Sequence, residues 1–407
     1  MKIFQIALGI LAAIGGFVDI GDLVFNVAAG ATFGYELLWV IVIGVVGIIV
    51  YSEMCGRVAA VSEKAVFDAV RERAGFGAGL MTLIAAQIVN LMTLAAEIGG
   101  VAICLRLLSG LPYRWLILLA IIVVGLVVWI VPFDWIERIF GYGGLCLLVF
   151  AVAAVKLHPD WGAVAHGFVP QIDTDDTLLY LYFAVGLLGA AMTPYEVYFY
   201  SSGGVEEGWT PKDLGINRAN SLIGYGLGGF LSFTLMITGG ALFLGQSIEP
   251  ETLGTISMGA QVPLGEVGLL LALLGILFAV GGASIDTLLA GAYNLAQFMG
   301  WEWGRYRTNE GAPRFTLTWL ILLVLALGIV MTGVDPVMLT EYAVIFSVVA
   351  LPLTYLPILL VANDKAYMGA HANGRLANAL GIFYLVVILA VSLSAIPLMI
   401  LTNVGQS

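Results

Sequence analysis

Charge is scarce in this sequence. Only 11% of its 407 residues are Asp, Glu, Lys or Arg, whereas 61% are hydrophobic. A water-soluble domain of this length needs far more charge to cover its surface, so the composition excludes a soluble globular protein. The mean hydropathy of +1.02 indicates that the lipid bilayer is the solvent of this chain.

Basic residues, cysteine and histidine are also few. The chain has 16 Lys and Arg against 27 Asp and Glu, which argues against nucleic acid as a partner and suits a protein that handles cations. Cys55, Cys104 and Cys146 have neither a disulfide pattern nor a metal-ligand spacing, so we interpret them as small packing residues. His158 and His166 lie in one loop and are too few to form a metal site by themselves.

Long apolar runs are what the sequence has instead. Eleven of them are long enough to cross a bilayer. They cover about residues 4–33, 37–55, 78–109, 113–131, 137–157, 177–200, 218–245, 264–298, 315–333, 337–361 and 377–402. The N-terminus begins like a signal peptide but has no cleavage site before a polar chain, so we take it as the start of the first span. We expect one transmembrane domain over residues 1–402 in a plasma (inner) membrane.

The positive charges predict the orientation. With the N-terminus in the cytoplasm, thirteen Lys and Arg fall on the inner side and only Arg106, Arg114 and Lys156 on the outer side. The C-terminus is then outside. An outer loop carries four aspartates that would attract cations weakly, although an ordinary solvated loop is the simpler interpretation; they are Asp160, Asp173, Asp175 and Asp176.

Two spans are interrupted near their centres. The first contains "GGFVDIGDLVFN", with Asp19 and Asp22 among glycines, and the sixth contains "GLLGAAMTPYEVYFYSS", with Pro194 and Glu196. Helix interiors avoid Gly and Pro. Interruptions five helices apart predict an inverted repeat of two five-helix halves, about 4–157 and 177–361, with an eleventh helix at about 377–402.

The sequence resembles the Nramp family of divalent-metal transporters. "LAAIGGFVDIGD" with "AAGATFGYELLWV" is similar to the family's first span, whose signature there is Asp-Pro-Gly-Asn. Further similar segments follow in order over nearly the whole chain: "SEMCGRVAAVSEK", "DAVRERAGF", "AAEIGGVAICLRLLSGLP", "KLHPDW", "LLAGAYNLAQFMGW" and "ALPLTYLPI". The resemblance implies an all-α membrane protein of the LeuT type, with helices 1 and 6 broken at mid-membrane.

The resemblance also implies a metal site, and the chain departs from the family there. The family's Asp and Gly are kept as Asp19 and Gly21, whereas its Asn becomes Asp22. In the sixth span the family's Met-Pro-His-Asn reads Thr193, Pro194, Tyr195 and Glu196, and Ala190 takes the place of the residue whose carbonyl binds metal. Met192 lies one residue away, on a different face by the alignment. The soft thioether ligand is thus replaced by oxygen, which suits Mg²⁺, Ca²⁺ and Mn²⁺.

These departures predict the substrate. One divalent cation neutralises two aspartates that are costly at mid-membrane, and the small Thr193 leaves room for the waters that Mg²⁺ retains. The chain is therefore most similar to the magnesium-transporting relatives of the family, and we expect a carrier of Mg²⁺ with Mn²⁺ as a second substrate. Two alternatives stay open: Asp19 and Asp22 form a structural pair that binds freed backbone amides, and Glu196 is protonated or gate-forming instead of a ligand.

Proton coupling is a separate expectation. The family's proton-carrying histidine falls on Tyr195 and a second histidine on Tyr200, and its acidic residues along the third span read Glu97, Leu94 and Gln87. No histidine lies in a span where it would titrate near neutral pH. We therefore expect uncoupled, potential-driven transport. The alternative is a proton-coupled Mn²⁺/Fe²⁺ transporter of the ordinary Nramp type, in which Glu97 or Glu196 carries the proton.

The other intramembrane polar residues give weaker signals. Asp286 either pairs with a basic residue or lines the exit path; Ser347 and Thr354 are the polar candidates of the tenth span, where the family's glutamine falls on Val344. An intramembrane aspartyl protease is excluded because the Gly-x-Gly-Asp element is absent, and fixed aspartates would repel an amino-acid substrate. We expect a monomer that is not an enzyme and has no cofactor, with divalent metal ions and the bilayer as its partners.

Overall fold

The computed structural model describes residues 18–404 apart from Asp173, Asp175, Ser247, Glu249, Glu251, Thr308 and Asn309. Within these residues all regular structure is helical, and ten helices are long and apolar enough to cross a membrane. The predicted all-α membrane fold is therefore confirmed. The first half of the first span, including Gly15 and Gly16, lies outside the described residues.

The described part of the N-terminal half begins with α2 (Ile20–Phe33), α3 (Leu38–Ser62), α4 (Val66–Ser109) and α5 (Tyr113–Ile130). The fifth span is divided into α6 (Phe133–Gly144), η1 (Leu145–Leu147) and α7 (Leu148–Lys156). α4 begins twelve residues before the predicted span, because it continues past a kink at Gly75 (φ 72°) into polar residues that hydropathy does not detect.

The C-terminal half begins with the short helix α8 (Trp161–His166). Its membrane helices are α9 (Thr177–Ala191), α10 (Pro194–Glu206), α11 (Leu214–Ala219) continuing through η3 (Asn220–Gly224) into α12 (Tyr225–Phe243), α13 (Leu253–Met299), α14 (Pro313–Met331), α15 (Pro336–Asn363) and α17 (Arg375–Leu401). The short elements η2 (Pro211–Asp213), α16 (Lys365–Met368) and η4 (Gly369–His371) lie between them. The division into two repeats ending near 157 and 361 stays a prediction.

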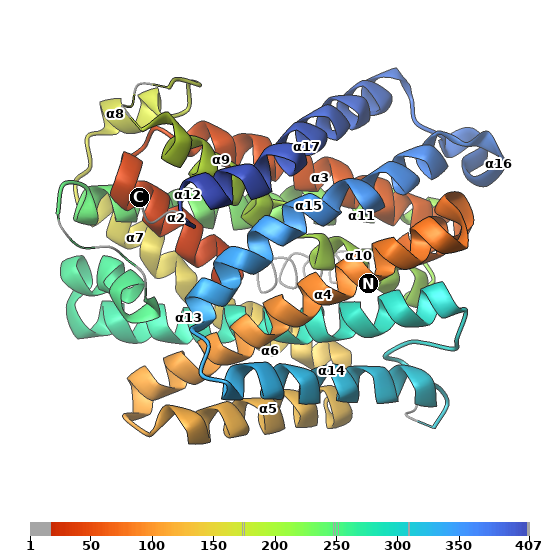
Figure 1. The fold of residues 1–407 in the computed structure, drawn as a ribbon, viewed down its shortest axis with the longest axis horizontal. Coiled ribbons are helices and arrows are strands. Elements are labelled where there is room, and N and C mark those ends of the chain that lie inside the picture. The colour runs from red at the N-terminus through yellow and green to blue at the C-terminus, as the bar shows by residue number, and fades with distance from the viewer. Residues whose placement is uncertain are drawn as a thin grey trace.

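Most helices run nearly parallel across the view in Figure 1, with α8 at one end of the molecule and α16 at the other. α2 packs against α12 through glycines: a Cβ at Gly30 would lie 2.3 Å from the Met236 carbonyl oxygen, and one at Gly239 2.5 Å from the Val27 oxygen. Small residues let two membrane helices approach this closely. This packing places the start of α2 in the protein interior.

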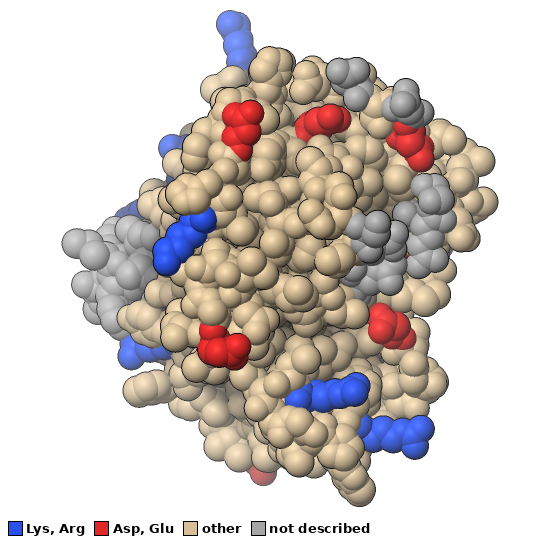
Figure 2. All heavy atoms as spheres, turned by 90° about the vertical axis from the view of Figure 1, so that its left-hand side faces the viewer, with Lys and Arg blue, Asp and Glu red and all other residues tan. Residues whose placement is uncertain are grey.

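The α8 end of the molecule is shown in Figure 2, where acidic and basic side chains are scattered singly among uncharged ones. Two of the four loop aspartates are helix caps. Asp160 accepts hydrogen bonds from the backbone of α8, and Asp176 accepts one from Leu179 N at 3.0 Å. Asp173 and Asp175 lie outside the described residues. Helix capping therefore accounts for Asp160 and Asp176 without a role in gathering cations.

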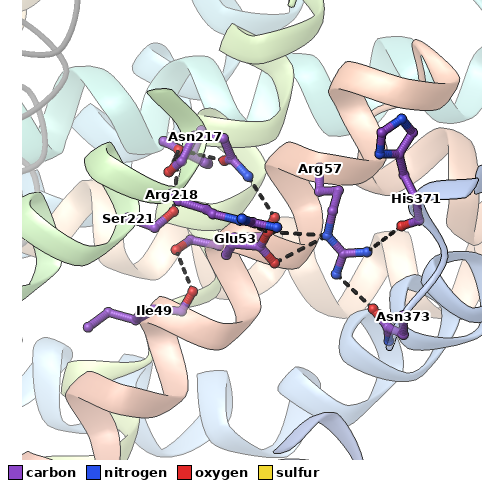
Figure 3. Close-up of polar contacts among 10 residues, drawn as sticks. Ile49, Glu53, Arg57, Asn217, Arg218, Ser221, His371 and Asn373 are labelled. Atoms are coloured by element: carbon purple, nitrogen blue, oxygen red, sulfur yellow. Dashed lines mark hydrogen bonds and ion pairs between the residues drawn. The ribbon is translucent and has the colours of Figure 1, made fainter. Parts of the chain in front are cut away.

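The opposite end is joined by a buried polar network around Arg57 of α3 (Figure 3). Its guanidinium pairs with Glu53 at 3.2 Å and donates to the His371 carbonyl at 2.9 Å and to Asn373 Oδ1 at 2.7 Å. Asn217 of α11 donates to the Glu53 carbonyl at 2.9 Å. The network ties α3 both to α11 and to the connection between α15 and α17.

Candidate metal-ion site

Asp19 is the N-cap of α2. Its backbone is extended (φ −86°, ψ −176°), and its Oδ1 accepts a hydrogen bond from Asp22 N at 2.9 Å. An aspartate at this position satisfies a backbone donor that the helix leaves unpaired. The side chain is only 2% exposed. The sequence thus starts a half-helix in the middle of the protein, with a carboxylate at its first residue.

Asp22 lies one turn further along α2 and is 1% exposed. Its Oδ1 accepts hydrogen bonds from Asn26 Nδ2 at 2.7 Å and from Ser232 Oγ of α12 at 3.2 Å. Its Oδ2 has no hydrogen-bond donor among the described residues. Asp19 is not helical, so the three-residue spacing does not place the two carboxylates on one helix face.

The sixth span is broken between α9 and α10. α9 ends at Ala191, Met192 and Thr193 have non-helical backbones, and Pro194 begins α10, where its missing N–H costs no hydrogen bond. Thr193 Oγ1 donates to the Ala190 carbonyl at 2.7 Å. The hydroxyl oxygen and the carbonyl oxygen each keep lone pairs, so both remain able to coordinate a cation.

The start of α2 and the α9–α10 break face a small cavity of about 10 Å³. Its walls come from the start of α2, the α9–α10 break, α4 and α15, and comprise Asp19, Ile20, Gly21, Thr93, Thr193, Thr340, Ala343, Val344 and Ser347. This volume holds roughly one water molecule or one ion. An ion that retains several waters therefore requires the site to widen when it enters.

Tyr195, Glu97 and Glu196 surround the aspartates. Tyr195 Oη donates to Asp19 Oδ2 at 3.3 Å, and Glu97 of α4 is fully buried. Glu196 is 7% exposed, and neither of its carboxylate oxygens has a donor among the described residues. Several other acidic side chains lie near enough to act on Glu196: Asp19, Asp22, Asp286 and Glu97. A bound cation would offset the cost of burying so many carboxyl groups together.

The predicted residues do not all converge. Asp19, Thr193 and Ser347 line the cavity, whereas Asp22 is directed to α12. Asp286 of α13 is partly exposed, and the charges of Glu137 and Arg305 act on it. Among the described residues, no three His, Cys, Asp or Glu side chains form a cluster suited to a metal. An ion here needs a mixed set of carboxylate, carbonyl, hydroxyl and water oxygens.

The positions of the family's proton relay have structural partners. Gln87 Nε2 donates to the Gly291 carbonyl at 2.9 Å, and Leu94 is buried. Tyr200 Oη donates to Asn217 Oδ1 at 2.8 Å, which joins α10 to α11.

Thr354, a polar candidate of the tenth span, accepts hydrogen bonds from Tyr51 at 3.0 Å and Tyr198 at 3.2 Å. These contacts connect helices.

Sequence reasoning missed four residues of the site. Thr93 and Thr340 line the cavity, and Asn26 and Ser232 bind Asp22. Asn26 could have been identified from its spacing, since a residue four positions after Asp22 lies on the same helix face. The other three sit in apolar spans with no spacing that distinguishes them from threonines and serines bonded to their own helix.

Comparison with known proteins identifies the family. The family model described as "Natural resistance-associated macrophage protein-like", Nramp, matches residues 9–397. The chain belongs to the Nramp family. The "Divalent metal cation transporter MntH" of Deinococcus radiodurans is 25% identical over 395 residues, covering 92% of this chain and 86% of that protein. The protein of the same name from Latilactobacillus sakei is 26% identical and covers 90% and 82%.

Solved structures show the same fold. A manganese transporter of Eremococcus coleocola superposes with a TM-score of 0.78 at 19% identity, covering 98% of this Nramp chain and 94% of that one. MhsT, in complex with L-phenylalanine, and MHP1, a nucleobase-cation-symport-1 family transporter, give TM-scores of 0.63 and 0.60. The LeuT-type fold is therefore confirmed. The Nramp relatives are named as metal transporters and not as enzymes, as the sequence predicted.

Proposed function

We propose that this Nramp protein carries divalent metal ions by alternating access, with Mg²⁺ as the preferred substrate and Mn²⁺ as the second. The observation that carries the proposal is the cavity between the start of α2 and the α9–α10 break, which Asp19 and Thr193 both line. Asp19, Asp22, the Ala190 carbonyl and the Thr193 hydroxyl supply the protein oxygens. Glu196 is buried beside them.

The donor chemistry supports Mg²⁺ over softer metals. Carboxylate, carbonyl and hydroxyl oxygens suit Mg²⁺ and Mn²⁺, whereas a thioether favours softer transition metals. The Met192 thioether does not line the cavity but lies beside α3, where a Cβ at Gly47 would be 2.5 Å from its sulfur. The relatives named above are divalent-metal or manganese transporters, so the preference for Mg²⁺ rests on these donors alone.

We further propose that transport is not coupled to protons. Tyr195 and Tyr200 stand where the family has histidines, and Leu94 and Gln87 stand where it has acidic residues. The membrane potential then drives uptake, since an inward-moving 2+ ion gains about 4–5 kcal/mol per 100 mV. The second candidate is a proton-coupled Mn²⁺ or Fe²⁺ transporter; the buried carboxylates Glu97 and Glu196 favour it.

The distribution of basic residues supports a plasma (inner) membrane protein with a cytoplasmic N-terminus and an outer C-terminus. On this assignment α8 lies outside, and the Arg57 network lies at the cytoplasmic end (Figure 1). We propose that the chain acts as a monomer and that the metal ion is its substrate, not a resident cofactor.

The change Asp19→Asn separates the ion site from a structural role. Asn caps a helix as well as Asp, so the hydrogen bond to Asp22 N is kept while the charge is lost. We expect saturable Mg²⁺ and Mn²⁺ uptake into proteoliposomes to fall by about tenfold or more, with unchanged amounts of folded protein. The matched control is Asp160→Asn, the same change at the N-cap of the outer helix α8. Near-normal uptake by Asp19→Asn contradicts the proposed site and favours the structural interpretation.

A further inference from the structure

The two oxygens of the Asp22 carboxylate have different surroundings. Oδ1 accepts a hydrogen bond from Asn26 Nδ2 at 2.7 Å and one from Ser232 Oγ at 3.2 Å. Oδ2 is buried and has no donor among the described residues. One oxygen is therefore occupied by protein donors, and the other remains to bind a ligand.

Asn26 holds its position through two bonds. Besides its bond to the carboxylate, its Nδ2 donates to the Asp22 carbonyl at 2.8 Å, so both amide hydrogens bind the same residue. Reversing the carboxamide would place its oxygen against two acceptors, which fixes the orientation of the side chain. Asn26 is 1% exposed. This buried amide therefore links the Asp22 carboxylate to the helix backbone.

Ser232 reaches the same oxygen from another helix. It is fully buried in α12, and its single hydroxyl proton has two acceptors within reach, Asp22 Oδ1 at 3.2 Å and the Gly228 carbonyl at 3.3 Å. The α2–α12 contact is closely packed at Gly30 and Gly239, so Ser232 has little freedom to move away. The carboxylate is thus held on one side by its own helix and by α12.

Coordination by one oxygen or by two distinguishes Mg²⁺ from Ca²⁺. Mg²⁺ takes six ligands at about 2.0–2.1 Å in near-octahedral geometry, with one oxygen from each carboxylate. Ca²⁺ takes six to eight ligands at about 2.3–2.6 Å and often uses both oxygens of one carboxylate. A carboxylate with one oxygen that already accepts hydrogen bonds from two donors has only its other oxygen left to coordinate Ca²⁺.

We propose that Asn26 and Ser232 are positioning residues that restrict Asp22 to coordination through one oxygen and thereby select against Ca²⁺. The inference rests on the proposed function, in which Asp22 contributes to the ion site. Asp19 differs, since both of its oxygens accept hydrogen bonds: Oδ1 from Asp22 N and Oδ2 from Tyr195 Oη. Specificity here comes from donors that occupy an oxygen which Ca²⁺ would otherwise use.

The test compares Ca²⁺ with Mn²⁺ in the variants Asn26→Leu, Ser232→Ala and the double variant. Leu is close to Asn in size and is a good helix former. The control is Ser257→Ala, because the buried Ser257 hydroxyl donates to the Leu253 carbonyl of its own helix, at 2.7 Å. Inhibition of Mn²⁺ uptake by Ca²⁺ is measured in proteoliposomes. Ca²⁺ and Mn²⁺ affinities are also measured from thermal-shift titrations of the purified proteins.

In the double variant we expect the ratio of Ca²⁺ to Mn²⁺ affinity to rise by about tenfold, whatever the accompanying change in the KM for Mn²⁺. Ser232→Ala alone should shift the ratio of Ca²⁺ to Mn²⁺ affinity in the same direction, and it keeps the proposal testable if the double variant does not fold. An unchanged ratio, or equal changes for both ions, overturns the proposal, since a merely structural role affects all ions alike.

The result is independent of the Mg²⁺ preference. If the wild-type protein carries Mn²⁺ but not Mg²⁺, the proposed substrate is wrong, yet the ratio of Ca²⁺ to Mn²⁺ still decides the role of Asn26 and Ser232. If Asp22→Ala leaves both affinities unchanged, Asp22 is not at the ion site and both proposals fail. The titrations give this answer even in a protein that shows no flux.

Discussion

At the scale of single residues, this protein is distinguished by positions of the Nramp motif that carry a different residue type. Thr193 was predicted as a hard ligand, and the structure places it on the cavity wall with Asp19. The different directions of the Asp19 and Asp22 side chains were not predictable. The sequence does not show that Asp19 is an extended N-cap and not a helical residue. Glu196 is buried beside the aspartates without lining the described cavity.

Thr193→Met tests whether the hard oxygen ligand at position 193, on the cavity wall, determines the metal selectivity. The change removes one hydroxyl, which donates to the Ala190 carbonyl, and returns a thioether to the broken segment. Because thioethers prefer soft metals, we expect Cd²⁺ to inhibit Mn²⁺ uptake at roughly tenfold lower concentration, with weaker Mg²⁺ uptake. Competition assays with Cd²⁺ and Mg²⁺ in proteoliposomes measure both effects.

The control for this change is Met192→Leu. The Met192 sulfur lies against α3 and α17, so its loss should leave Cd²⁺ inhibition unaltered. Cd²⁺ inhibition that is the same in Thr193→Met as in the wild type argues that ligand softness does not set the selectivity. A loss of Cd²⁺ inhibition in Met192→Leu would show that the 192 side chain reaches the ion in another conformation.

At the scale of helices, the two breaks and the glycine contacts position the site. The break of the sixth span follows from Pro194 and was predictable, since proline starts helices and does not continue them. The ends of the helices were less predictable. α13 begins at Leu253 and passes a kink at Gly265 (φ 67°), eleven residues before the predicted span, because hydropathy detects the membrane core and not helical continuity.

Gly239→Ala tests the close contact between α12 and α2. A Cβ there would lie 2.5 Å from the Val27 carbonyl oxygen and 3.0 Å from the Val27 Cα, both backbone atoms that cannot rotate away. We expect a loss of about 1–3 kcal/mol in the free energy of unfolding, seen as a lower melting temperature in detergent. The same change at Gly226 of α12, which has no atom within 4 Å of its Cβ position, should cause no such loss. Equal melting temperatures for the two variants contradict the assigned packing.

At the scale of the whole molecule, the sequence predicted a bundle of broken and unbroken helices but not the connections between their ends. Arg73 of α4 forms an ion pair with Asp364, and this guanidinium holds the pKa of the Asp364 carboxyl below its ordinary value. Arg57 of α3 binds His371 and Asn373 (Figure 3). The segment from Asp364 to Asn373 is therefore tied to both α3 and α4. Such contacts join residues about 300 positions apart, which spacing along one sequence does not show.

The same limit applies to transport. Composition and the positions of Asp19 and Asp22 predicted a cation carrier, and the family match and fold agree with that class. Energy coupling depends on whether a buried carboxylate takes up a proton during the cycle. Glu97 and Glu196 are the buried candidates, and neither spacing nor burial reveals their protonation during transport.

The most direct measurement of the central claim is Mg²⁺ flux into proteoliposomes with the internal pH followed at the same time. We expect saturable Mg²⁺ uptake that increases with an inside-negative potential, with no internal acidification and no response to an imposed pH gradient. Asp19→Asn serves as the inactive reference. Proton influx that accompanies Mg²⁺ or Mn²⁺ at zero potential and disappears in Glu97→Gln or Glu196→Gln would contradict the account and establish a proton-coupled transporter.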